Sequence, residues 1–178
     1  MNICVCIKQV PDTTEIRIDP ETNTLIRKGV PSIVNPFDLY ALEMALQLRE
    51  KKSGKIYILS MGPGQAEQAV KFCLEMGADE GFLISGRAFG GSDTYATSYI
   101  LSRGVRTVET VENIEFDLIL CGKQAIDGDT AQVGPEMAEH LGIPQITMAL
   151  DLYFEGENLI VKRESREGYD LMTTSFPA

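Results

Sequence analysis

Short apolar runs alternate with amphipathic stretches along most of the chain. The runs at residues 3–7, 56–60, 81–85 and 118–121 have the length of strands that are buried on both faces. Between them, apolar residues recur at helical spacing and predict helices at about 36–52, 66–76, 94–112 and 133–141. A further strand is expected near residues 145–149. This order predicts an α/β fold: an open parallel sheet with helices on both faces.

Two regions depart from this alternation. Residues 15–30 alternate around the turn-rich segment DPETNT, which predicts a small antiparallel hairpin inserted at 12–34. Residues 152–154, 159–163 and 169–174 predict antiparallel strands around EGEN and SREG turns. We therefore expect one α/β domain over residues 1–178 with a C-terminal antiparallel β extension at 150–178, whose outer strand leaves an exposed sheet edge.

The segment FDLILCGKQAIDGDTAQVGPEMAEHLG, at 116–142, has the strongest functional pattern. Its apolar run ends at Gly122, a polar loop follows, and a helix then begins with Pro135 in its first turn and ends at Gly142, which suits a left-handed C-cap. A loop between a strand and a helix N-terminus presents free N–H groups to an anion. From spacing alone, a phosphate site and an ordinary strand–helix turn are equal alternatives.

The chain contains neither G-x-x-x-x-G-K-[ST] nor G-x-G-x-x-G, so the two common phosphate loops are excluded. Asp127 and Asp129 would repel a pyrophosphate and suit ribose hydroxyls or loop amides better. As paired carboxylates, they are interpreted as turn formers rather than as a general acid and base. The loops that start at Lys8, Met61, Ser85 and Gly122 follow parallel strands, so we expect them to converge on one ligand.

Composition narrows the function further. The formal net charge of −10 argues against nucleic acid or an anionic membrane as a partner. No apolar run reaches the length of a membrane span, and MNICVCIKQV lacks a basic region before its apolar stretch, so a cytoplasmic protein is expected. The four cysteines form no C-x-x-C and the single histidine, His140, lies near a predicted helix end. The sequence therefore indicates no metal site and no catalytic residue.

Four segments, in order along the chain, carry a resemblance to a known family. They are VCIKQVPD at 5–12, NPFDLYALEMALQL at 35–48, SMGP at 60–63 and GKQAIDGDTAQVGPEMAEHLGIPQ at 122–145. Together they resemble the β subunit of electron transfer flavoproteins, which are αβ heterodimers. The resemblance implies an adenine-nucleotide-binding, Rossmann-like domain, and an electron carrier that passes electrons from a flavin to an acyl-CoA-type dehydrogenase or another acceptor. Oxidoreductase activity with NADH would then belong to the heterodimer.

The resemblance also implies the residues that bind the nucleotide. They comprise a strand residue, a helix start, the end of the second strand and the polar loop: Cys6, Asn35, Pro36, Phe37, Asp38, Met61, Gly122, Lys123, Gln124, Ala125, Ile126, Asp127, Gly128, Asp129, Thr130, Ala131, Gln132 and Val133. The chemistry of the residues supports these implied contacts in part. Asn35 is a good N-cap before Pro36, and Thr130 can contact phosphate oxygens.

The nucleotide is AMP in most members of the family and a second FAD, reduced by NADH, in the bifurcating members. RAFGGSDTYATS, at 87–98, resembles the corresponding loop of the bifurcating members. Without the resemblance, a glycine turn with a Ser/Asp/Thr N-cap is the favoured interpretation. With it, FAD and NAD(H) are expected, contacted by Phe89, Gly90, Gly91, Thr94 and Thr97.

Three functions compete at this stage: a bifurcating β subunit with FAD, a β subunit that binds AMP structurally, and a non-redox adenine-nucleotide-binding protein. The family's β chains continue beyond the position of SFPA, into a loop that docks on partner dehydrogenases and an arm around the α subunit. These partner contacts are therefore expected either in a longer form of the chain or elsewhere in it.

Overall fold

A computed structural model describes residues 1–12 and 31–178. The alternation at 15–30 that predicted a hairpin lies outside the described residues. On either side of that segment, β2 (Gln9–Pro11) and β3 (Ser32–Val34) pair in antiparallel register, with Val10 opposite Ile33.

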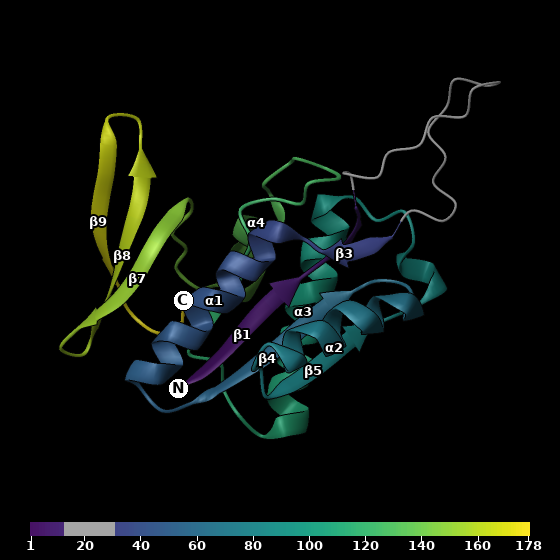
Figure 1. Ribbon diagram of the computed structural model, residues 1–178, viewed down its shortest axis with the longest axis horizontal. Coiled ribbons are helices and arrows are strands. Elements are labelled where there is room, and N and C mark those ends of the chain that lie inside the picture. The colour runs from purple at the N-terminus through teal and green to yellow at the C-terminus, as the bar shows by residue number, and fades with distance from the viewer. Residues whose placement is uncertain (13–30) are drawn as a thin grey trace.

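A parallel sheet of four strands forms the centre of the fold, as the alternation of elements predicted (Figure 1). Its strands are β1 (Asn2–Ile7), β4 (Lys55–Met61), β5 (Glu80–Ile84) and β6 (Leu118–Cys121). Their order is β5-β4-β1-β6, and every neighbouring pair is parallel. The chain therefore reverses its direction of travel across the sheet at β1. In sheets of this kind such a reversal places ligands at the carboxyl ends of the strands on either side of it, here β1 and β6.

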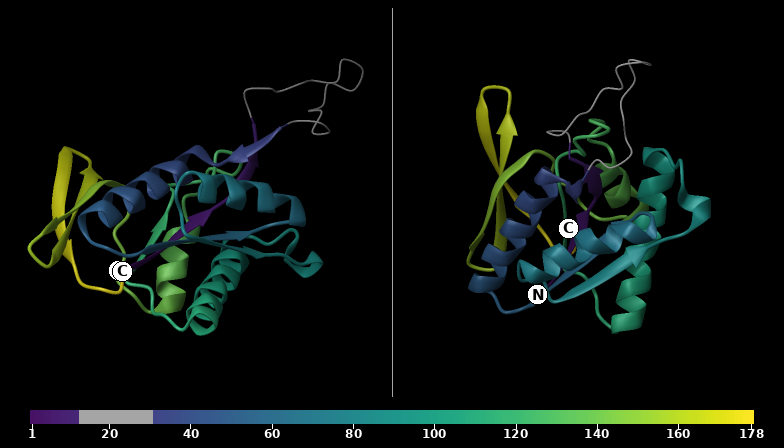
Figure 2. Two further views of the ribbon diagram at one scale, coloured as in Figure 1. Left: turned by 60° about the horizontal axis from the view of Figure 1, so that its bottom comes forward. Right: turned by 45° about the vertical axis from the view of Figure 1, so that its right-hand side comes forward.

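Helices cover both faces of this sheet (Figure 2). They are α1 (Pro36–Lys51), α2 (Glu67–Glu75), α3 (Thr94–Glu112) and α4 (Val133–Leu141), with short 3₁₀ turns η2 (Gly64–Ala66) and η3 (Arg87–Phe89). The odd-numbered residues of β1 pack under α1 and α2, whereas Cys4 and Cys6 pack under α3 and α4. Two separate cores result, as expected for strands buried on both sides.

Local signals account for the helix ends. The Asp93 carboxylate accepts from the Ala96 N–H at 2.8 Å and caps α3, and Gly142, at φ 69°, ends α4 as predicted. The α3 helix continues without a break through Gly104. A side chain at Gly104 would collide with Ile84, so the glycine lets α3 approach β5 closely.

The strand predicted near residues 145–149 is wrong, because residues 143–148 form no strand. Met148 has a positive φ of 58°, which turns the chain away from the parallel sheet. From there, β7 (Ala149–Glu155), β8 (Asn158–Ser165) and β9 (Gly168–Thr174) form the predicted antiparallel sheet, which stands beside α1 at the left of Figure 1. The side chains of Tyr169 and Leu171 on β9 are both 58% exposed.

After β9 the chain returns to the parallel sheet. The Ala178 N–H donates to the Asp117 carbonyl at 3.1 Å, and the Ala178 carbonyl accepts from the Ile119 N–H at 2.7 Å. One residue bonded to both neighbours of Leu118 is the hydrogen-bond pattern of a parallel pair. None of the helices that the structure describes has the length and apolarity of a membrane span.

Candidate functional site

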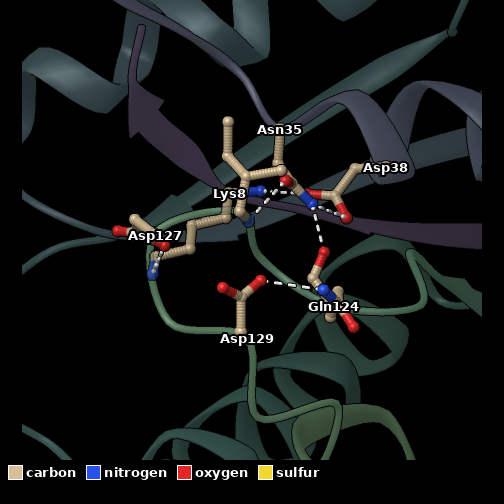
Figure 3. A network of polar contacts seen from close by, with 7 residues as sticks. Lys8, Asn35, Asp38, Gln124, Asp127 and Asp129 are labelled. Carbon is tan, nitrogen blue, oxygen red and sulfur yellow. Dashed lines mark hydrogen bonds and ion pairs between the residues drawn. The ribbon is translucent and has the colours of Figure 1, made fainter. Parts of the chain in front are cut away.

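A buried polar network links the start of α1 to the loop after β6 (Figure 3). At its centre is Asn35, which is 1% exposed and precedes α1. Its amide nitrogen donates to Asp38 Oδ1 at 2.9 Å and to the Gln124 carbonyl at 2.8 Å, and its oxygen accepts from the Ile126 N–H at 3.2 Å. The prediction that this side chain caps α1 is therefore wrong, because it is committed to the distant loop instead.

Asp38 is the buried acceptor of the network. Its carboxylate accepts from the Lys8 N–H at 2.7 Å as well as from Asn35, and the Gly122 N–H adds a further bond. Burial raises the pKa of Asp38 to about 6, although these hydrogen bonds and the nearby Lys8 ammonium act in the opposite direction. The carboxylate thus ties the end of β1, the start of α1 and the end of β6 together.

An ion pair and a side-chain hydrogen bond shape the outer part of the loop. Lys8 Nζ lies 2.7 Å from Asp127 Oδ1, and Gln124 Nε2 donates to Asp129 Oδ1 at 2.8 Å (Figure 3). Asp129 and Ala131 both have φ of 55°, a left-handed conformation that sharp loops use. Asp127 and Asp129 are therefore occupied by protein partners, which agrees with their interpretation as turn formers.

Gly122 allows the loop to start in contact with α1. A side chain there would collide with Asp38 Oδ1 and would lie 2.7 Å from the Phe37 carbonyl carbon and 2.8 Å from the Asp38 nitrogen. In contrast, a side chain at Gly128 would meet no atom within 4 Å. Gly122 is thus required by packing, whereas Gly128 leaves open space at the loop tip.

The third predicted loop lies at the start of α3. Gly91 has φ of 80° and open space where a side chain would stand, and the Phe89 ring packs against Gly86. The Thr94 hydroxyl donates to Glu136 Oε1 of α4 at 3.3 Å, so this loop contacts the first turn of α4. The second oxygen of Glu136 is buried and has no partner among the described residues.

The remaining predicted residues lie at the same edge of the sheet. Cys6 is opposite Leu59 on β4 and Cys121 on β6, and Met61 ends β4 one residue beyond the partner of Ile7. The Asn35 N–H donates to the Lys8 carbonyl at 2.8 Å, which places the start of α1 at this edge too. The predicted contacts from β1, β4, α1 and the polar loop are therefore brought together; whether they bind a nucleotide stays a prediction.

A cavity of about 680 Å³ lies next to the network. Its walls come from α1, β6, α4, residues 143–150 and the β7–β9 sheet, and they are mainly apolar. Four predicted contacts line it: Phe37, Gly122, Lys123 and Ala131. Apolar walls do not suit a phosphate, so we place the polar part of a ligand at the network and not in this cavity.

The site fits an anionic group on one further observation. The N-cap residue of α4, Gln132, makes no side-chain hydrogen bond to the helix, so its first-turn N–H groups lack a side-chain cap. Uncapped N–H groups beside a loop threonine suit phosphate oxygens. Sequence reasoning placed the loop that starts at Lys8 at this edge but did not single out the Lys8 side chain, and it did not name Glu136. A lysine after a strand at the reversal point was a usable signal for Lys8, whereas nothing local distinguishes Glu136.

The fold is a doubly wound α/β sheet whose strand order reverses between β1 and β6, and the polar network lies at the carboxyl ends of these two strands. The family model described as "Electron transfer flavoprotein domain" matches residues 22–178. The chain therefore belongs to the electron transfer flavoprotein family.

Curated relatives agree with this assignment. Electron transfer flavoprotein subunit beta of Megasphaera elsdenii is 55% identical over 179 residues, and that of Thermoanaerobacterium thermosaccharolyticum is 54% identical over 177. The caffeyl-CoA reductase–Etf complex subunit CarD of Acetobacterium woodii is 49% identical over 178 residues. Each match covers 99% of this chain, and the chain spans 66% of the length of each of these three relatives.

Proposed function

We propose that the edge formed by β1, β4, β6 and the start of α1 binds an adenine-containing nucleotide, as the β subunit of an electron transfer flavoprotein. The network around Asn35 is the observation that carries this proposal. It fixes the loop after β6, which leads into the N-terminus of α4 and pairs with Lys8 through Asp127. Two of the three hydrogen bonds of the buried Asn35 side chain go to this loop and fix its backbone beside the ends of β1 and β6, where a ligand would contact it.

The nucleotide that we propose is FAD, with NAD(H) as the electron donor. When bound, FAD accepts a hydride and releases electrons singly, so the protein itself needs no acid or base. The chain's residues position and shield it. Thr130 and the N–H groups of α4 would hold phosphate oxygens, and Gly90 and Gly91 allow close approach of a ring at the start of α3.

AMP is the second candidate, and one contact favours it. The Thr94 hydroxyl is already bonded to Glu136, which takes one of the proposed flavin-side donors away from a ligand. An AMP would need only the network and the α4 N-terminus. In that case the chain would hold the nucleotide structurally, and the redox flavin would belong mainly to the α subunit.

The activity of the whole protein follows from this proposal. We infer that the chain works in a heterodimer with an α subunit and passes electrons from NADH to an acyl-CoA-type dehydrogenase or a comparable acceptor, with electron bifurcation. The name of the Acetobacterium woodii relative, which joins an Etf to a caffeyl-CoA reductase, supports an acceptor of this kind. The exposed apolar face of β9 is a suitable contact for a partner chain.

Reconstitution tests the proposal. The protein would be co-expressed with an α-type subunit, stripped of nucleotide, and incubated with FAD or with AMP. We expect the heterodimer to take up a flavin in addition to that of the α subunit and to lose flavin absorbance on addition of NADH. Uptake of AMP in place of the additional flavin would select the second candidate, and uptake of neither would refute the nucleotide site.

A further inference from the structure

Lys8 is held in place by its backbone, independently of its side chain. Its N–H donates to Asp38 Oδ2 at 2.7 Å and its carbonyl accepts from the Asn35 N–H at 2.8 Å. These bonds fix the residue directly after β1, at the reversal point of the sheet. The position of Lys8 in the fold therefore does not depend on its side chain, which is available to contact a ligand.

That side chain reaches the loop after β6. Its ammonium group lies 2.7 Å from Asp127, which is 119 positions away in the sequence. The Lys8 side chain is about half exposed, and the Asp127 side chain is partly exposed. Ligand atoms can thus approach both groups. Asp127 and Asp129 outnumber Lys123, the lysine of this loop, in a chain whose formal net charge is already −10, so a phosphate there would be repelled unless a further cation offsets it.

We propose that Lys8 is a specificity residue of this site, which selects ligands that carry a phosphate, and that Asp127 competes with the phosphate for the Lys8 ammonium. This inference rests on the proposed nucleotide site and adds a residue to it that the family resemblance did not supply. It applies equally to the phosphate of AMP and to the pyrophosphate of FAD. Binding of a phosphate exchanges one anion beside Lys8 for another, while Asn35 continues to hold the loop.

The proposal predicts opposite effects for the two partners. Without the Lys8 charge, a phosphate loses its counter-ion and still faces two aspartates. Without the Asp127 charge, the phosphate loses a competitor. Adenosine carries no phosphate, so both changes should leave its affinity almost unaltered.

Calorimetric titration of the full chain with AMP and with adenosine tests this. We expect Lys8→Met to weaken AMP about tenfold and Asp127→Asn to strengthen it about threefold, with adenosine within about twofold of wild type in both. Lys8→Arg, which keeps the charge, should restore most of the AMP affinity. Lys71→Met is the matched control. Lys71 pairs with Glu67 on α2 at 2.7 Å, the same distance as between Lys8 and Asp127, and its substitution changes the net charge by the same amount.

Equal losses of AMP and adenosine affinity in Lys8→Met would show a merely structural role and overturn the inference. So would weaker AMP binding in Asp127→Asn, or an effect of Lys71→Met as large as that of Lys8→Met. A wild-type chain that binds neither compound would instead refute the proposed nucleotide site. The inference and its premise therefore fail in distinguishable ways.

Discussion

Replacing Asn35 by alanine should loosen the loop after β6 more than any exposed substitution nearby. The side chain is 1% exposed and makes three hydrogen bonds, to Asp38, the Gln124 carbonyl and the Ile126 N–H. At roughly 1 kcal/mol of net stability for each bond, the loss is about 3 kcal/mol. The backbone groups of Gln124 and Ile126 also lose the partner that fixes the loop, so we expect nucleotide affinity to fall about tenfold.

Urea unfolding and nucleotide titration of the same preparations measure both effects. Gln47→Ala is the matched control on the same helix. Gln47 is also an amide, but it is exposed and donates to Glu43 at 2.8 Å one turn away. We expect this control to change the free energy of unfolding by less than about 0.5 kcal/mol and to leave nucleotide affinity unchanged.

The reasoning would be refuted if Asn35→Ala cost less than about 1 kcal/mol, since three buried hydrogen bonds cannot be that weak together. A large loss of stability with unchanged nucleotide affinity would refute the claim that the network arranges the loop for a nucleotide. In that case the network would hold the fold together but would not arrange the loop for a ligand.

Three further outcomes are expected. Gly122→Ala should destabilise the protein by about 3 kcal/mol in thermal unfolding because of its clash with Asp38 and the adjoining backbone, whereas Gly128→Ala should be nearly neutral; equal effects would contradict the described packing. Burial raises the pKa of Asp38 from 3.8 to about 6, so the folded state binds a proton more tightly than the unfolded state. The Asp38 contribution to the free energy of unfolding should therefore fall by about 3 kcal/mol as the pH rises from about 4 to above 6, and Asp38→Asn should remove this dependence. Gly90→Leu should weaken FAD binding far more than AMP binding in equilibrium titrations, because the added side chain would occupy the place proposed for the flavin ring. Gly90 has an ordinary φ of −66° that a leucine can adopt, so the backbone should tolerate the change. Equal losses would argue against a ring near this loop.

The sequence predicted those parts of the fold that depend on local signals. The parallel strands are short apolar runs, and Asp93 and Gly142 carry their cap chemistry with them. The strand expected at 145–149 failed because its apolar residues line a cavity and Met148 turns the chain to a second sheet. Residues 145–149 are half-buried or exposed, so the apolar run correctly predicted neither a place in the parallel sheet nor full burial.

The sequence predicted which residues lie at the candidate site but not which residues they contact there. Asn35 had the right identity for an N-cap, yet its side chain bonds to residues about ninety positions away. The pairing of Lys8 with Asp127 spans 119 positions and follows from the parallel register of β1 and β6, which no local pattern encodes. The open space at Gly91 and Gly128, in contrast to the crowding at Gly122, likewise required the structure.

The most direct test of a nucleotide site at this edge of the sheet is to identify the small molecule released on acid denaturation of the protein purified together with its α-type subunit. Chromatography with mass spectrometry would give both its identity and its amount. We predict an adenine nucleotide beyond the flavin of the α subunit, namely a second equivalent of FAD, and a smaller amount of it from the same preparation of Asn35→Ala. Release of no adenine nucleotide beyond that of the α subunit would contradict the account.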